Sequence, residues 1–208
     1  MHTSGLKRMR KLQFILLAGI ILVTHMACEK DPGPEPDKEN PFILEENFNG
    51  FAIDTNIFAT PNAFIEIWGV TSDGIDSSAN FDVTFSDGIY SSFYRQIIND
   101  SIKVYFDINS PSIEDLSPGI YYVDGEIARK PNNIVQAYIQ FTTYNPFTGA
   151  EVKVTTYPVL EGSTVEVLES DGFYKVIYNL VTVIDMQRVE VNGQYSGLYT
   201  IIDQRVGS

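Results

Sequence analysis

Phe64, Glu66 and Trp68 stand at alternate positions and combine side chains suited to sugar recognition. Alternate residues of an extended strand share one face, so two aromatic rings would flank one carboxylate. An aromatic ring can stack on a sugar ring, and the carboxylate can accept hydrogen bonds from its hydroxyl groups. The competing interpretation is structural, because a single tryptophan in a β domain often packs in the core or at its rim.

Tyr90 and Tyr94 are a second aromatic candidate for ligand stacking. They follow an Asp87-Gly88 turn signal and could therefore be exposed on a loop. Exposed apolar side chains that gather in one place often mark a contact site. Packing against the domain is again the alternative.

The 27 aspartates and glutamates raise the question of metal binding or hydrolysis. A calcium loop around Asp73, Asp76 and Asp82 would need ligands at alternate positions and a closing glutamate, and the spacing does not provide them. We therefore predict neither a metal site nor a cofactor. Glycoside hydrolysis by two carboxylates needs no histidine, so the composition leaves it open as an enzymatic alternative. No pair of acids is singled out, and we expect a non-enzymatic chain without catalytic residues.

The N-terminus has the order of an export signal. Four Lys and Arg residues at positions 7–11 precede an apolar run over residues 12–23. A membrane-spanning helix needs roughly 20 apolar residues, so a permanent transmembrane anchor is the weaker interpretation. Ordinary signal cleavage requires small residues one and three places before the cut, and residues 25–27 do not supply that pair.

Cys28, the single cysteine, follows Ala27 and precedes three charged residues, two of them acidic. This arrangement resembles the lipobox of bacterial lipoproteins, whose cysteine receives a diacylglycerol and becomes the new N-terminus. His25 stands where that motif usually has an aliphatic residue. The acidic residues resemble the surface-export signal of Bacteroides-type lipoproteins. The resemblance implies a signal peptide over residues 1–27 and an anchor at Cys28 in the outer membrane of a diderm bacterium, on the periplasmic or the surface side.

Lipidation of Cys28 would limit the chemistry left to the mature chain. Both histidines, His2 and His25, would be removed, and the only thiol would be acylated. A Ser/His/Asp triad, a Cys/His dyad, a zinc site with imidazole or thiolate ligands and a redox CxxC pair each need a side chain that is then missing.

The charge of the mature chain also restricts its partners. Loss of four of the 14 Lys and Arg leaves 10 against 27 acidic residues, a formal charge of −17. Nucleic acid and anionic headgroups need a basic surface, so neither is an expected partner. Membrane contact is expected through the acyl chains on Cys28.

Residues 28–41 have the composition of a tether. Four prolines alternate with acidic residues there, which favours an extended backbone without a core. Residues 42–208 are long enough for one domain of ordinary size. Apolar and polar residues alternate within this part over residues 81–86, 102–108 and 135–141, as in half-buried strands. We therefore predict a single all-β domain, an antiparallel sandwich or barrel.

Two turn signals near the C-terminus lead to opposite predictions. A hairpin at Asp171-Gly172 would pair Val167 with Val176 and Val165 with Tyr178, so that apolar residues meet. A hairpin at Asn192-Gly193 would set apolar residues against polar ones, and we reject it. Residues 189–201 instead keep one period-two register, with glycines that mark a bulge or a close neighbour, and the chain reversal is expected near residues 185–188.

Two short motifs carry a further resemblance. One is the stretch NSPSIEDLSPGIYYV over residues 109–123, and the other is the terminal NGQYSGLY over residues 192–199. Both are similar to a group of Bacteroides-type lipoproteins with a PGxYxx turn and a GxYxG terminal strand. That group implies the fold and the cell-envelope location, and it implies no activity.

The expected function is binding, to a glycan, a peptide or another envelope partner. One alternative is a calycin-like barrel that holds a small apolar ligand, which requires a cavity in place of a filled core. Another is the carboxylate hydrolase, which requires two facing acids in a cleft. The sequence leaves the oligomeric state open.

Overall fold

The computed structural model describes residues 44–70, 78–124, 130–170 and 173–205. The chain divides into two units, Met1–Pro41 and Phe42–Ser208, and the described residues belong to the second. The predicted signal peptide, the lipidation site and the tether lie outside the described residues, as do Asp73 and Asp76.

No helix in the described part of the chain is long and apolar enough to cross a bilayer.

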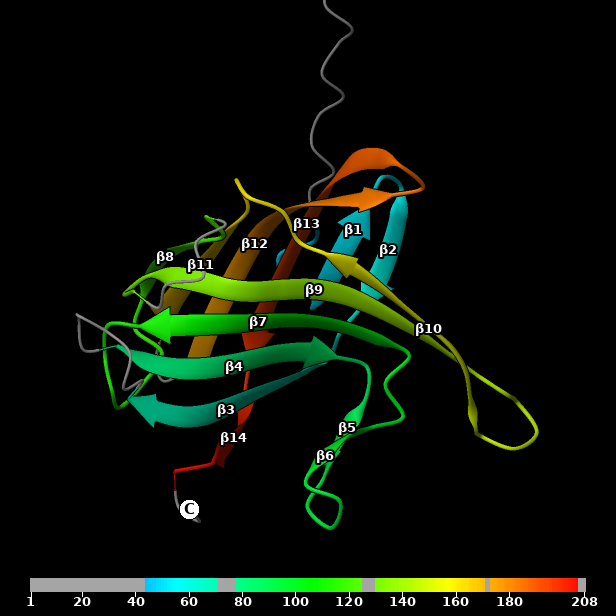
Figure 1. Cartoon of the computed structure of the whole chain (residues 1–208), viewed down its shortest axis with the longest axis horizontal. Helices are drawn as coiled ribbons and strands as arrows, with labels where there is room; N and C mark the ends of the chain where they lie inside the picture. The colour runs from blue at the N-terminus through cyan, green and yellow to red at the C-terminus, as the bar shows by residue number, and fades with distance from the viewer. Residues whose placement is uncertain (1–43, 71–77, 125–129, 171–172, 206–208) are drawn as a thin grey trace, which may run out of the picture. The chain divides into compact units, whose positions relative to one another are not determined.

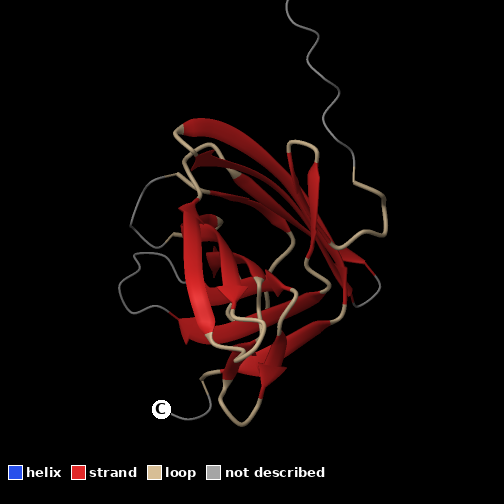
Figure 2. Cartoon of the chain, turned by 90° about the vertical axis from the view of Figure 1, so that its right-hand side faces the viewer, coloured by secondary structure: helices blue, strands red, loops and turns tan. Residues whose placement is uncertain are grey.

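The prediction of an all-β domain is confirmed, because the described residues form strands joined by turns and loops (Figures 1 and 2). The strands are β1 (Gly50–Ile53), β2 (Asn56–Ala59), β3 (Asn62–Val70), β4 (Ala79–Ser86), β5 (Ile89–Ser91), β6 (Gln96–Ile98), β7 (Ile102–Ser110), β8 (Gly119–Tyr122), β9 (Asn133–Tyr144), β10 (Glu151–Pro158), β11 (Thr164–Ser170), β12 (Phe173–Ile184), β13 (Gln187–Gly197) and β14 (Tyr199–Asp203).

Twelve of these strands form one curled sheet, and β5 and β6 form a separate hairpin. The order in the large sheet is β14-β3-β4-β7-β9-β8-β11-β12-β13-β1-β2, with β10 paired to β9 beside this path. The curl places a front layer (β14, β3, β4, β7, β9 and β10) across a back layer (β8, β11, β12, β13, β1 and β2), as Figure 1 shows. Pairing is antiparallel except for β14 with β3 and β8 with β9, which are parallel.

The predicted hairpin around Asp171-Gly172 is confirmed in its register, although the turn itself lies outside the described residues. Val167 pairs with Val176, and Val165 pairs with Tyr178. The rejected hairpin is also absent, since β13 runs through Asn192 and Gly193 without a turn.

The reversal before β13 occurs at Asp185 and Met186, as predicted. Both residues have left-handed backbone angles, with φ of 49° and 65°. This conformation at both central positions matches the right-handed twist of a two-residue hairpin. β12 and β13 therefore pair along their whole length, from Ile184 opposite Gln187 to Tyr174 opposite Gly197.

The single period-two register predicted for residues 189–201 is wrong as a description of one strand. β13 ends at Gly197, and after Leu198 the chain crosses to the front layer, where β14 pairs with β3. Tyr195 and Tyr199 nevertheless both contact the ring of Phe85, with centroid distances of 5.2 and 6.3 Å. The alternation thus held for Tyr195 and Tyr199 across the change of neighbour, whereas Ile201, which the same pattern placed with them, is 62% exposed.

Aromatic rings fill the space between the two layers. Phe85 lies at their centre, 5.7 Å from Tyr178 and 6.1 Å from Phe106 between ring centroids. These three side chains are fully buried. Close packing of these rings fills the centre of the space between the layers.

Candidate functional site

The outer face of the front layer carries the polar and aromatic side chains that alternate with the core. Ala63, Ile65 and Ile67 of β3 are buried in the core. Glu66 therefore points away from it and lies opposite Asp82 of β4, which in turn lies opposite Asp107 of β7. Cross-strand neighbours have Cβ atoms about 5 Å apart. The three carboxylates form a row across three strands, and this row with its aromatic neighbours is the candidate site.

Trp68 lies beside this row and is 50% exposed. It stands at an irregularity of the β3–β4 register, between Ile67 and Gly69. Its Nε1 donates a hydrogen bond of 2.9 Å to Oδ2 of Asp82. The bond holds one edge of the indole, while half of the side chain remains open to solvent. The single tryptophan is thus not a core residue.

Asp82 is the central carboxylate of the row. Burial raises its pKa to about 6, and the charges of Asp107 and Glu66 add to this effect, against the hydrogen bonds from Tyr105 and Trp68. Burial and the charge of Asp82 raise the pKa of the Tyr105 hydroxyl in turn. Asp82 therefore accepts two hydrogen bonds from neutral donors, in a partly buried environment with neighbouring carboxylates that disfavours its negative charge.

The other two carboxylates are held by amide side chains. Nδ2 of Asn80 donates to Asp107, and Nε2 of Gln204 donates to Glu66 over 3.0 Å. Within the described residues, no group of three or more Asp, Glu, His or Cys side chains is placed to hold a metal ion. The row offers hydrogen-bond acceptors in a fixed arrangement.

Tyr105 and Tyr138 extend the aromatic surface of the outer face. They lie opposite each other on β7 and β9, and their rings stack with centroids 4.8 Å apart. Gln136, two positions before Tyr138, lies opposite Asp107 and continues the polar row onto β9. Sequence reasoning missed these residues. Their outward direction could have been read from the alternation, but their position beside Trp68 and Asp82 could not.

The other predicted stacking residues, Phe64, Tyr90 and Tyr94, are partnered by other rings. Phe64 is 3% exposed, and the ring of Tyr90 lies 6.5 Å from it, so Phe64 is covered. Tyr94 is 63% exposed in the turn between β5 and β6 and makes an edge contact with Phe93 at 4.9 Å. Of the five predicted residues, Glu66 and Trp68 both lie next to Asp82, Glu66 opposite it in the register and Trp68 through its hydrogen bond.

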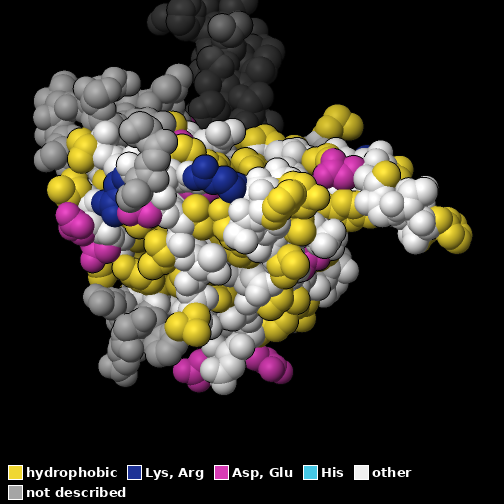
Figure 3. Space-filling model, turned by 90° about the horizontal axis from the view of Figure 1, so that it is seen from below, with side chains coloured by type: hydrophobic (Ala, Val, Ile, Leu, Met, Phe, Trp, Pro, Cys, Tyr) yellow, Lys and Arg dark blue, Asp and Glu magenta, His cyan; other side chains and the backbone are white. Residues whose placement is uncertain are grey.

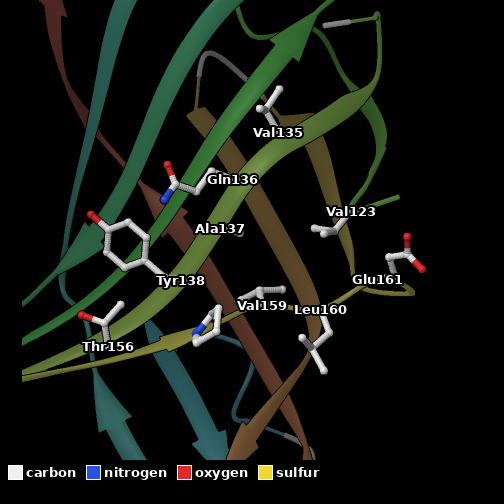
Figure 4. Close-up of a pocket in the computed structure, with 10 residues that line it drawn as sticks. Val123, Val135, Gln136, Ala137, Tyr138, Thr156, Val159, Leu160 and Glu161 are labelled. Carbon is white, nitrogen blue, oxygen red and sulfur yellow. The ribbon is translucent and has the colours of Figure 1, made fainter. Parts of the chain in front are cut away.

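A cavity of about 340 Å³ lies at the β9 end of the outer face. We call it the notch, and Figure 4 shows β9 on one side of it and Val123, Leu160 and Glu161 on the other. It is lined by Val123, Val135, Gln136, Ala137, Tyr138, Thr156, Pro158, Val159, Leu160 and Glu161.

The notch arises because β9 changes its neighbour along this edge. Asn133 pairs with Tyr122 of β8, whereas Tyr138 pairs with Pro158 of β10. Between these pairs, the amide of Val159 donates to the carbonyl of Ala137 over 2.9 Å. The cavity lies where these pairings change, and its lining includes Val123, just after β8, and Pro158, the last residue of β10.

Exposed apolar side chains also occur elsewhere, as in the β5–β6 hairpin, where Phe93 contacts Tyr94. Seen from below, they are spread among polar groups, and one lies at the tip of a projecting arm (Figure 3). The turn between β9 and β10 carries Phe147, which is 94% exposed. Single exposed apolar residues are normal on a protein surface. The outer face differs from these isolated apolar residues because its aromatic side chains lie beside the carboxylates of the row, which are hydrogen-bond acceptors held by neighbouring side chains.

No protein-family model matches this chain. No curated protein matches it, and no solved structure does.

Proposed function

We propose that this protein is a lipid-anchored, non-enzymatic protein of the bacterial cell envelope that binds a glycan on the outer face. The observation that carries the proposal is the half-exposed ring of Trp68, whose Nε1 is held by Asp82 at 2.9 Å. A ring fixed at one edge loses little conformational freedom when a ligand stacks on its open side. Glu66, Asp82 and Asp107 supply acceptors for sugar hydroxyl groups beside it.

The charge of the outer face selects among glycans. Three adjacent carboxylates would repel uronic acids, sulfated sugars and phosphates. The whole chain carries a formal charge of −13, which acts in the same direction. The ligand class that this surface fits is a glycan without acidic groups.

The arrangement of the acids supports binding over hydrolysis. Glycosidases place two carboxyl groups on opposite sides of the scissile bond, roughly 5 to 9.5 Å apart. Glu66, Asp82 and Asp107 instead stand side by side in one row on one face of the sheet. A sugar stacked on Trp68 would meet them from one side.

The anchor rests on the sequence. The basic cluster, the short apolar run and Cys28 follow one another in the order of a lipoprotein signal. A proline-rich acidic spacer over residues 29–41 would then hold the β domain away from the bilayer. Such a protein can meet polysaccharide in the envelope or at the cell surface.

A glycan array with the full chain, followed by titration calorimetry, tests the proposal. We expect binding to one or more neutral glycans, a loss of at least tenfold in affinity for Trp68→Ala, and a smaller loss for Trp68→Phe. Val70→Ala is the matched control, because Val70 is exposed near the end of the same strand. A wild-type chain that binds no glycan, or equal affinity in the Trp68→Ala variant, would refute the proposal.

A further inference from the structure

The hydrogen bond that holds Trp68 has an acceptor that can take up a proton. Nε1 of Trp68 donates to Oδ2 of Asp82 over 2.9 Å, and the hydroxyl group of Tyr105 donates to the same carboxylate. An indole N–H group is always a donor. Burial and the charge of Asp82 raise the pKa of the Tyr105 hydroxyl, so this group also stays protonated. The carboxyl group of Asp82 is therefore the one of the three groups whose state changes with pH.

Like charges lie on both sides of Asp82. Glu66 of β3 and Asp107 of β7 are its partners in the two strand registers. Burial of Asp82 and both of these charges favour its protonated form, whereas its two hydrogen bonds favour the ionised form. Burial raises the pKa of Tyr138 on β9, on which the charge of Asp82 also acts, so this hydroxyl stays neutral.

Two cations near this face are engaged by other carboxylates. The ammonium group of Lys103 on β7 lies 3.1 Å from a carboxylate oxygen of Asp100. The guanidinium group of Arg205, after β14, lies 2.8 Å from a carboxylate oxygen of Asp203. The groups that act on Asp82 itself are neutral donors and carboxylates. In the free protein, uptake of a proton is therefore what relieves the repulsion along the row.

A proton on Asp82 changes its hydrogen bonds. The ionised carboxylate is an acceptor only, and charge-assisted bonds to it are roughly twice as strong as bonds between neutral groups. The protonated group carries an O–H donor, and Glu66 and Asp107 offer it acceptors on both sides. Asp82 then keeps one oxygen as a good acceptor for two donors, Trp68 and Tyr105. The bond that fixes the indole ring is weakened.

We infer that proton uptake by Asp82 releases the ring of Trp68 and thereby weakens glycan binding at the outer face. The inference rests on the proposed function and names a regulation of that site. In the ionised form the indole is fixed for stacking, and the carboxylate accepts hydroxyl groups of a sugar. In the protonated form the ring is free to turn, and the carboxyl group donates to its neighbours. Because the pKa of Asp82 is about 6, the change falls roughly between pH 5 and pH 7.

The single tryptophan allows a test without any glycan. One indole N–H signal is expected in the ¹H–¹⁵N NMR spectrum of the full chain, since the sequence has one Trp. We expect this signal to move along a one-proton curve whose midpoint is the pKa of Asp82, about 6. The proton resonance should lie further upfield at the acidic end, because its hydrogen bond is weaker there.

Three variants identify the group that takes up the proton. Asp82→Asn should abolish the titration, because asparagine can accept the same bond but does not ionise. Glu66→Gln should lower the midpoint by removing one neighbouring charge. Glu190→Gln is the matched control with the wild-type curve, since Glu190 is an exposed carboxylate on β13. A wild-type signal that stays in place between pH 5 and pH 7, or an unchanged titration in Asp82→Asn, would overturn the inference.

An array of neutral glycans, read at pH 5 and at pH 7, measures the consequence for binding. For a pKa of about 6, the ionised fraction of Asp82 differs about tenfold between these values, so we expect about tenfold weaker binding at pH 5. Asp82→Asn should show no such difference. Equal wild-type binding at both values would overturn the inference and leave the proposed function standing. An array without binding at either value would refute the proposed function, and the indole signal alone would then decide whether Asp82 releases Trp68.

Discussion

The ring of Tyr178 lies directly against the backbone of Gly193 on the neighbouring strand. A Cβ atom added to Gly193 would stand 2.0 Å from Cε2 and 2.1 Å from Cζ of that ring. Tyr178 is fully buried and pairs with Gly193 in the β12–β13 register. The glycine is thus required by the close approach of a neighbour, which is one of the two alternatives that the sequence left open for the glycines of this strand.

Gly193→Ala is expected to lower the free energy of unfolding by about 3 kcal/mol or more, because the ring is enclosed in the core and cannot move aside. Urea denaturation followed by tyrosine fluorescence measures this loss. Gly197→Ala is the control, since its added Cβ would meet the Tyr195 hydroxyl at 3.0 Å and the loss should be smaller. Equal stability of Gly193→Ala and the wild type would contradict the packing described for Tyr178.

Met186→Gly should stabilise the domain. Met186 is 96% exposed and has a φ of 65°, so its side chain makes little packing contribution in a conformation that suits glycine. We expect a gain of about 1 kcal/mol in the free energy of unfolding. A thermal melt measures it. Leu198→Gly serves for comparison because Leu198 is also exposed, and a gain of the same size there would remove the turn explanation.

Asp82 should make the domain less stable as the pH rises. Its pKa is about 6 in the fold against 3.8 unperturbed, so the folded chain keeps the proton where the unfolded chain releases it. The stabilisation is complete below pH 3.8 and is lost as the pH rises through 6. Asp82→Asn should therefore be more stable than the wild type at pH 8, by about 2 kcal/mol after allowance for its partial exposure, and similar at pH 4.

Urea denaturation at both pH values measures the effect of Asp82→Asn. Glu151→Gln is the matched control, because Glu151 is an exposed carboxylate on β10. The two variants should differ in how stability depends on pH. If the free energy of unfolding of Asp82→Asn depends on pH in the same way as that of the wild type, a group other than Asp82 causes this dependence.

Cys28→Ser should release the protein from the membrane fraction. The proposed anchor is a diacylglycerol on the Cys28 sulfur, and serine offers no thiol for it. Fractionation of cells and mass spectrometry of the processed chain measure the outcome, with an increase in mass by the lipid expected for the wild type. An unmodified thiol in the processed wild-type chain, or unchanged fractionation of the variant, would rule out lipid anchoring.

The sequence by itself determined which face of several strands enters the core. The alternation of Phe81, Val83 and Phe85 corresponds to buried positions of β4, and the apolar matches across Asp171-Gly172 correspond to the observed register. Both properties are local, because side-chain direction has a period of two residues and a short hairpin pairs residues close in the chain.

Only the tertiary structure decided which strands became neighbours. Glu66, Asp82 and Asp107 meet because β3, β4 and β7 pair side by side, and the notch exists because β9 pairs first with β8 and then with β10. The crossing of the chain from β13 to β14 at Leu198 was likewise decided by the tertiary structure. The alternation of apolar and polar residues along a strand is the same whichever strand pairs with it. Strands distant in sequence are brought together by the packing of the whole core.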